Sequence, residues 1–221
     1  MISAESLVFV IDDDASVRRG LSRLLRSANY QSEIFPSADD FLERTPHPGP
    51  ACVVVDVRMP GLGGIELQET LIQRQREEQL VFITGHGDIA MCAHAMKAGA
   101  VDFLPKPFAN EDLLRCVERA LSRSIEERRR NAEKVAARHL LDSLTPREFE
   151  VMQLVITGIL NKQICAELGT AEKTVKVHRG RVMKKLGVAS VAELVRLVQR
   201  AVVSPPVSRN RDCDYSLKEL S

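Results

Sequence analysis

The sequence has no tryptophan, only 4% aromatic residues and five cysteines. The cysteines are scattered, without a Cys-x-x-Cys pair or a nearby histidine cluster, which argues against a disulfide framework or a thiolate metal site. They are Cys52, Cys92, Cys116, Cys165 and Cys213. Apolar runs are short as well, and none approaches the roughly 18 residues of a membrane span. We therefore expect a soluble, unexported cytoplasmic protein with reduced thiols and no membrane association.

The two halves of the chain carry opposite charge. Residues 1–120 contain 12 Lys and Arg against 18 Asp and Glu, a net charge of −6, whereas residues 121–221 contain 19 against 12, a net charge of +7. A length of 221 residues with 44% apolar residues suits two small domains. The near-neutral total of +1 thus conceals an acidic domain and a basic one.

The acidic half alternates predicted strands with predicted helices. Residues 51–56 form an apolar run without alternation, typical of a buried parallel strand, and a Met-Pro-Gly turn follows at 59–61. Further strands are expected at 7–11, 33–35, 80–84 and 101–104, the last broken by Pro105. Helices are expected at 15–28, 37–43, 63–75, 85–97 and, capped by Asn110, through 121. Five strands alternating with five helices predict an α/β doubly wound parallel sheet within residues 1–121.

The basic half is predicted to be helical. Residues 122–142 are predicted to form a charged, helical linker, for which a dimer contact is one possible role. A capping box from Thr145 to Glu148, with proline at the first helical position, opens an all-α four-helix domain at 143–203. Its helices are expected at 146–157, 161–168, 171–186 and 191–202, the last opened by a second capping box from Ser190 to Glu193. The Pro-Pro pair and mixed charge of 204–221 predict a disordered tail.

Polar residues follow several of the predicted strands. Carboxyl ends of parallel strands share one sheet edge, so Asp12, Asp13, Asp56, Thr84 and Lys106 should converge there. Clustered carboxylates favour a hard cation such as Mg2+. Asp56 is then a candidate nucleophile that forms an aspartyl phosphate, with Lys106 and the Thr84 hydroxyl contacting phosphoryl oxygens.

The pattern of these acids also allows two other interpretations. A single aspartate at a strand end is usually a solvated residue, but five positions in one pattern favour a site. The segment from Ile11 to Ser16 also resembles the Asp-x-Asp signature of haloacid-dehalogenase phosphatases. That resemblance explains neither Asp56 nor the basic half.

Taken together, the acidic half resembles the receiver domains of two-component response regulators of the FixJ/NarL type. The matching segments are the aspartates at 12–13, VDVRMPG at 55–61, ITGHGD at 83–88, AMKAGAVDF at 95–103 and KPF at 106–108. The resemblance implies a flavodoxin-like sheet with strand order 2-1-3-4-5. Pro105 departs from relatives that often carry an acid there.

The receiver resemblance also implies roles for individual residues. Asp13, Asp56 and the Arg58 carbonyl would ligate Mg2+, with Asp12 acting through water. Asp56 would accept a phosphoryl group from a sensor histidine kinase, and Thr84 and Phe103 would form the switch pair. The Lys106-Pro107 peptide would be cis.

The third helix of the basic half has two unlike sides. At 100° per residue, Val175, Val182 and Leu186 share one direction and form a stripe suited to burial. A basic helix face is often merely solvated, but the third helix of a compact domain can also enter a DNA major groove. The residues on the opposite side are Lys173, Lys176, Val177, Gly180 and Lys184.

The basic half resembles the LuxR-type helix-turn-helix. The matching segments are LTPRE at 144–148, GILNK at 158–162, KTVKVHR at 173–179 and VMKKLG at 182–187. The resemblance implies base recognition through Lys176 and Val177. The remaining expected DNA-contact residues are Asn161, Lys162, Lys173, Thr174, Gly180, Arg181 and Lys184. Gly180 departs from relatives with a long polar side chain there.

These resemblances predict a transcription factor rather than an enzyme. We expect an activator that binds double-stranded DNA, forms a homodimer on phosphorylation of Asp56 and works with RNA polymerase. The alternative within the same class is a DNA-binding regulator whose receiver is not used as a phosphorylation switch.

Overall fold

The computed structural model describes residues 6–85 and 89–201. The chain divides into two compact units between Arg130 and Asn131, and each is described by itself. The expected tail at 204–221, Cys213 and the last residue of the predicted helix 191–202 lie outside the described residues. Within the described ranges, the helices are all too short or too polar to cross a membrane.

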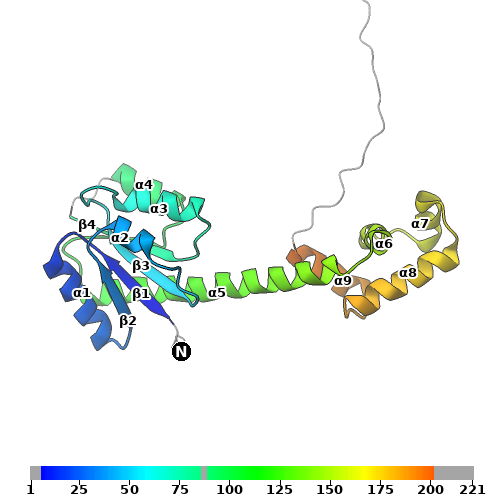
Figure 1. Cartoon of the computed structure of the whole chain (residues 1–221), viewed down its shortest axis with the longest axis horizontal. Coiled ribbons are helices and arrows are strands. Elements are labelled where there is room, and N and C mark those ends of the chain that lie inside the picture. The colour runs from blue at the N-terminus through cyan, green and yellow to red at the C-terminus, as the bar shows by residue number, and fades with distance from the viewer. Residues whose placement is uncertain (1–5, 86–88, 202–221) are drawn as a thin grey trace, which may run out of the picture. The chain divides into compact units, whose positions relative to one another are not determined.

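The first unit is built on a five-stranded parallel sheet (Figure 1). Its strands are β1 (Leu7–Ile11), β2 (Gln31–Phe35), β3 (Ala51–Asp56), β4 (Gln79–Thr84) and β5 (Asp102–Pro105). Their order is β2-β1-β3-β4-β5, which confirms the predicted fold class. In the centre Val10 is aligned with Val54, and Val55 with Phe82. Each residue of β3 is buried, as expected for a strand covered on both faces.

Five helices belong to this unit or begin in it. They are α1 (Ala15–Ser27), α2 (Ala38–Glu43), α3 (Gly64–Gln73), α4 (Ile89–Lys97) and α5 (Asn110–Asp142). Successive β1 residues point to opposite faces, so Phe9 packs with Phe41 and Leu67 from α2 and α3, whereas Val10 packs with residues of α1 and α5. The carboxylate of Asp14 caps α1 by accepting the Ser16 N–H at 2.6 Å.

Two details of the predicted elements around β5 and α5 differ in the structure. Pro105 does not break β5 but is its last residue, aligned with Thr84, since an edge strand tolerates a residue without an N–H. Asn110 is the first residue of α5 rather than its cap. Helix α5 joins the helix expected through residue 121 and the helical segment expected at 122–142 into one uninterrupted helix that ends at Asp142.

Polar contacts attach the middle of α5 to the amino edge of the sheet. The Ser124 hydroxyl accepts the Ala51 N–H at 3.1 Å. Glu127 accepts the Gln79 side-chain amide at 2.6 Å, and Arg128 pairs with Glu77 at 2.8 Å. These partners lie at or just before the starts of β3 and β4, so the helix is anchored to the first unit well past residue 121.

The second unit is helical. Its helices are α6 (Pro146–Ile156), α7 (Asn161–Leu168), α8 (Glu172–Lys185) and α9 (Val191–Ala201). They enclose one core around Met152, Ile164, Val175 and Leu194, each fully buried. The predicted capping box of Thr145 and Glu148 is present in both directions.

The second predicted capping box is only half formed. The Ser190 hydroxyl accepts the Glu193 N–H at 3.2 Å, as expected. The Glu193 carboxylate, however, accepts the N–H of Ala189 at 2.9 Å rather than that of Ser190. The Glu193 side chain therefore binds the main chain one residue before the position that a complete capping box requires.

Candidate functional site

Three aspartates meet at the carboxyl edge of the sheet. Asp12 follows β1 and is 0% exposed, and Asp56 ends β3 and is 8% exposed, while Asp13 is exposed. One carboxylate oxygen from each lies within 4.8 Å of the others. This is a set of hard oxygen donors of the type that Mg2+ prefers. The acidic pocket, meaning Asp12, Asp13 and Asp56, is thus assembled as the strand pattern predicted.

Lys106 supplies the positive charge of the acidic pocket. Its Nζ donates to Asp12 Oδ2 at 2.8 Å and to Asp56 Oδ2 at 2.6 Å. Burial raises the pKa of Asp12, against the opposing hydrogen bond from Lys106. Burial would lower the pKa of Lys106, but the hydrogen bonds and charges of Asp12 and Asp56 outweigh it and raise that pKa. Lys106 therefore stays cationic at neutral pH. The Lys106-Pro107 peptide is cis.

Main-chain groups orient the two buried carboxylates. Asp12 Oδ1 accepts the N–H of Asp14 at 2.8 Å, and Asp56 Oδ1 accepts the N–H of Arg58 at 3.0 Å. Arg58 thus meets Asp56 through its N–H, and the expected role of its carbonyl stays a prediction. Gly64 allows the chain to pass close to the end of β3, because a Cβ there would lie 2.6 Å from the Asp56 carbonyl oxygen.

The expected switch pair lies on the two neighbouring strands. Thr84 ends β4 and is 1% exposed, and Phe103 lies half-buried on β5. The Phe103 ring packs against that of Phe82, with centroids 6.3 Å apart. Thr84 therefore lies at the carboxyl end of β4, whereas Phe103 belongs to the apolar cluster that includes Ala95 and Met91 of α4.

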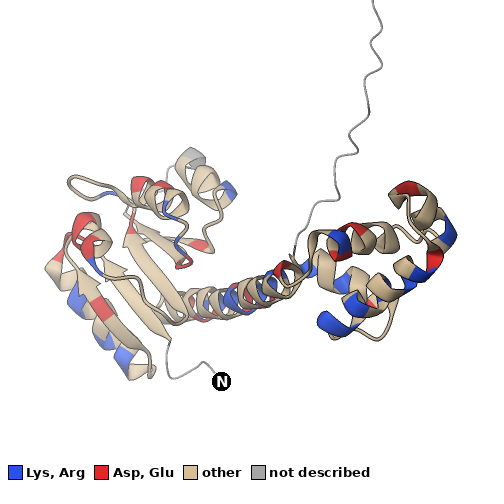
Figure 2. Ribbon diagram, turned by 45° about the vertical axis from the view of Figure 1, so that its right-hand side comes forward, with Lys and Arg blue, Asp and Glu red and all other residues tan. Residues whose placement is uncertain are grey.

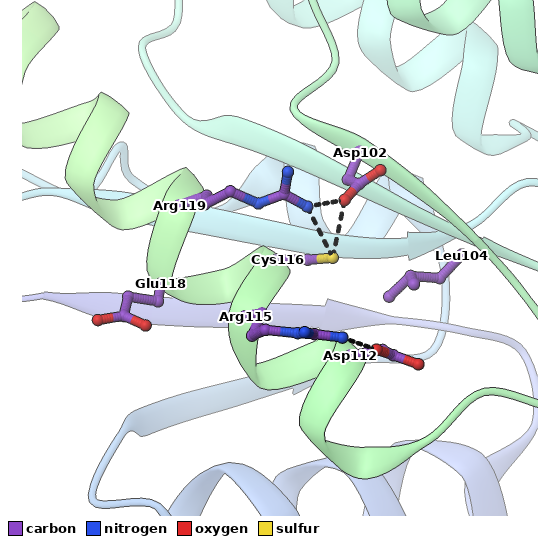
Figure 3. A pocket seen from close by; sticks show the side chains of 7 residues that line it. All are labelled: Asp102, Leu104, Asp112, Arg115, Cys116, Glu118 and Arg119. Carbon is purple, nitrogen blue, oxygen red and sulfur yellow. Dashed lines mark hydrogen bonds and ion pairs between the residues drawn. The ribbon is translucent and has the colours of Figure 1, made fainter.

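Asp102, which the sequence reasoning did not single out, holds the backbone beside Phe103. Its Oδ1 accepts the Phe103 N–H at 2.9 Å, and its Oδ2 accepts the Cys116 thiol at 2.9 Å and the Arg119 guanidinium (Figure 3). These side chains line a pocket of about 500 Å³ between β5 and α5. Burial, followed by the Asp102 acceptor, raises the pKa of Cys116 to about 11. The thiol is thus a protonated donor rather than a reactive thiolate.

On α8 the buried and exposed sides fall as the helical projection predicted. Val175, Val182 and Leu186 are buried, whereas Val177 is 46% exposed. Figure 2 shows basic residues recurring along this helix. The other exposed candidates for DNA contact on α8 are Lys173, Thr174, Lys176, Gly180, Arg181 and Lys184.

Three basic residues of α8 have partners inside the second unit, and one of them is Lys176, whose Nζ lies 3.0 Å from Glu172 Oε1. Lys185 Nζ contacts Glu148 Oε2 at 2.7 Å, and Arg179 donates to Asn161 Oδ1 at 3.0 Å. The hydrogen bond from Lys185, aided by the Thr145 N–H, lowers the pKa of Glu148 to about 2. Lys185 therefore joins α8 to the start of α6.

The other two candidates lie at the start of α7. Asn161 and Lys162 line a pocket of about 470 Å³ together with Arg179 and Glu172 of α8. The Asn161 side-chain oxygen is bonded to Arg179, so its amide N–H groups are what it could offer to DNA. The start of α7 is thereby held to the middle of α8.

Comparison with known proteins agrees with this architecture. Residues 8–118 match the response regulator receiver domain, and residues 142–198 match the bacterial regulatory proteins of the luxR family. Nodulation protein W of Bradyrhizobium diazoefficiens is 46% identical over 91% of this chain and 89% of its own length. The transcriptional regulatory protein FixJ of the same organism is 42% identical over 88% of this chain and 95% of its length. The solved structure of the response regulator StyR is 51% identical, with a TM-score of 0.77, covering 89% of this chain and 100% of that one.

A receiver domain followed by a LuxR-type helix-turn-helix defines a two-component response regulator that binds DNA. The chain belongs to this family and, within it, to the FixJ/NarL type. Its relatives are transcriptional regulators. The matched families differ from the haloacid-dehalogenase phosphatases, the rival interpretation of the first aspartates.

Proposed function

We propose that this response regulator is switched by phosphorylation of Asp56 in the presence of Mg2+. The observation that carries the proposal is the joint contact of Lys106 Nζ with Asp12 and Asp56 beside a third carboxylate. Asp12, Asp13, Asp56 and the Arg58 main chain would hold the ion. Bound Mg2+ supplies positive charge that offsets the carboxylates and binding positions for phosphoryl oxygens.

The chain's own residues divide the remaining tasks. A sensor histidine kinase would be the donor, so the P–N bond to its histidine breaks as an O–P bond forms to the Asp56 carboxylate. Lys106 would exchange a carboxylate contact for a phosphoryl oxygen, and the Thr84 hydroxyl would donate to another. Phe103 could then turn inward, which changes the balance between two packings of the face that includes α4 and β5.

Labelling with a small phosphodonor tests the acceptor. Acetyl phosphate with Mg2+ should add one phosphoryl group to the wild type, detected by intact mass, and none to Asp56→Asn. Asp39→Asn, at an exposed acid on α2, should label as the wild type does. Undiminished labelling of Asp56→Asn would refute the assignment. Turnover of small phosphoesters would favour the phosphatase alternative, and equal DNA binding with and without phosphorylation would favour a receiver that is not a switch.

We further propose that α8 reads double-stranded DNA, with Lys176 and Val177 at base edges. Lys173, Thr174, Gly180, Arg181 and Lys184 would lie along the groove and its phosphates, and Asn161 and Lys162 would contact the backbone. The support is the exposure of the residues named on α8, opposite the buried stripe of Val175, Val182 and Leu186.

The remaining proposals concern assembly and cellular role. Phosphorylation would drive homodimerisation through the receiver face at 88–121, of which Asp88 lies outside the described residues. Two reading helices would then meet two half-sites. We propose a cytoplasmic activator that works with RNA polymerase.

A further inference from the structure

Helix α1 directs one of its four arginines toward the acidic pocket. The helix contains Arg18, Arg19, Arg23 and Arg26 and no acid. Arg19, Arg23 and Arg26 are exposed, whereas Arg18 is partly buried and its Nη1 donates to the main-chain oxygen of Asp12. Arg18 therefore differs from its neighbours by holding the turn that carries two of the three carboxylates.

The contact is made at the peptide that joins Asp12 to Asp13. The Asp12 side chain is already oriented by Asp14 N–H at 2.8 Å and by Lys106 Nζ at 2.8 Å. Asp13 is exposed, so the direction of its carboxylate depends on the main chain. Arg18 binds the carbonyl oxygen of the Asp12-Asp13 peptide and so limits rotation of that peptide plane. The orientation of this plane sets the direction in which the Asp13 side chain projects.

Arg18 is also attached to the same turn through its own main chain. Its N–H donates to the Asp14 carbonyl oxygen at 3.0 Å, in the first turn of α1. A main-chain bond and a side-chain bond from one residue thus connect α1 to both ends of the segment from Asp12 to Asp14. This arrangement resembles the outer contacts that orient metal-binding residues in proteins.

We propose that Arg18 is a positioning residue that sets the Asp12-Asp13 turn for Mg2+ and does not itself touch the phosphoryl group. The inference rests on the proposed function of the acidic pocket. Loss of a contact of this kind lowers metal affinity by about 10- to 100-fold in other sites, so Arg18→Met should bind Mg2+ at least about tenfold more weakly. Arg18→Lys keeps a cationic donor and should recover part of the loss.

The test is a Mg2+ titration of the full-length protein, followed by the amide NMR signals of Asp13 and Arg58. The same spectra report whether each variant is folded. Arg19→Met is the matched control, because Arg19 is the adjacent, exposed arginine, and it should bind as the wild type does. If Arg18→Met does not fold, Arg18→Gln takes its place with the same expected loss.

A second readout separates positioning from direct participation. The initial rate of labelling by acetyl phosphate is measured against Mg2+ concentration. Arg18→Met should need about tenfold more Mg2+ for half its maximal rate and reach a plateau within about twofold of the wild type. An unchanged Mg2+ dependence with a lowered plateau would mean that Arg18 acts on the phosphoryl group, and the proposal would be wrong.

The experiment distinguishes failure of the proposed Mg2+ site from failure of the proposed role of Arg18. If the wild type does not bind Mg2+ at Asp13 and Arg58, the proposed function fails and the role of Arg18 fails with it. If the wild type binds and Arg18→Met or Arg18→Gln binds equally well while folded, only the role of Arg18 is refuted.

Discussion

Replacing Gly180 by alanine should separate stability from DNA binding in the second unit. Gly180 lies in the middle of α8, and a Cβ added there would meet no heavy atom within 4 Å. Glycine in a helix interior costs about 0.5–1 kcal/mol relative to alanine, so Gly180→Ala should raise the free energy of unfolding by about that amount. Hydrogen exchange of α8 amides should slow by about two- to fivefold.

The same methyl group should weaken DNA binding. Gly180 is exposed on the side of α8 that carries Lys176 and Val177, so a methyl there would press against the DNA in a close complex. An overpacking cost of about 1 kcal/mol corresponds to about a fivefold loss of affinity. Binding is measured at fixed salt to a duplex selected from random sequences by the phosphorylated protein.

Gly20→Ala is the matched control. Gly20 also lies inside a helix, α1, and a Cβ there also meets nothing within 4 Å. It should slow exchange in α1 and leave DNA affinity unchanged. Faster exchange of α8 in Gly180→Ala would refute the stability reasoning. Unchanged affinity would remove Gly180 from the DNA contacts.

Three further predictions concern the DNA-binding unit and assembly. Lys176→Ala should make the free energy of DNA binding less favourable by about 1–3 kcal/mol and relax base preference, whereas Lys184→Ala should weaken binding to all DNA sequences alike. If Lys176→Ala binds with the affinity and selectivity of the wild type, α8 is not the helix that reads the bases. Because the pKa of Glu148 is lowered to about 2 from 4.5, the unfolded state binds its proton first. The stabilising contribution of the Glu148 carboxylate is complete above about pH 4.5 and is lost as the pH falls toward 2. Lys185→Met should therefore destabilise the second unit at pH 7 and much less near pH 2. Hydrogen exchange of the α6 amides measures the difference. Beryllofluoride should convert the monomer to a dimer in analytical ultracentrifugation, and a monomer in both states that binds DNA normally would refute the coupling.

The sequence alone was sufficient for features that depend on local pattern. An apolar run without alternation predicts a buried strand, and a residue that follows such a strand must lie at its carboxyl end. The strand order was available only through the resemblance to receiver domains. Because the carboxyl ends of parallel strands share one edge, Asp12, Asp56 and Lys106 could be expected together without the order. The distances from Lys106 Nζ to Asp12 Oδ2, 2.8 Å, and to Asp56 Oδ2, 2.6 Å, agree with that expectation. The buried stripe of α8 followed in the same way from the period of the helix.

Contacts between residues far apart in the chain were decided only by the tertiary structure. Charge pattern alone could not distinguish Arg18, whose side chain turns to the Asp12 carbonyl, from the exposed Arg19 beside it. Nor could it show that Lys185 pairs with Glu148, 37 residues away. The sequence predicted helix on both sides of residue 121, but not the contact of Ser124 with Ala51, 73 residues away, which holds the helix against the sheet beyond that point. Local propensity acts over a few residues, whereas the partner of a long polar side chain depends on which segments the fold brings near it.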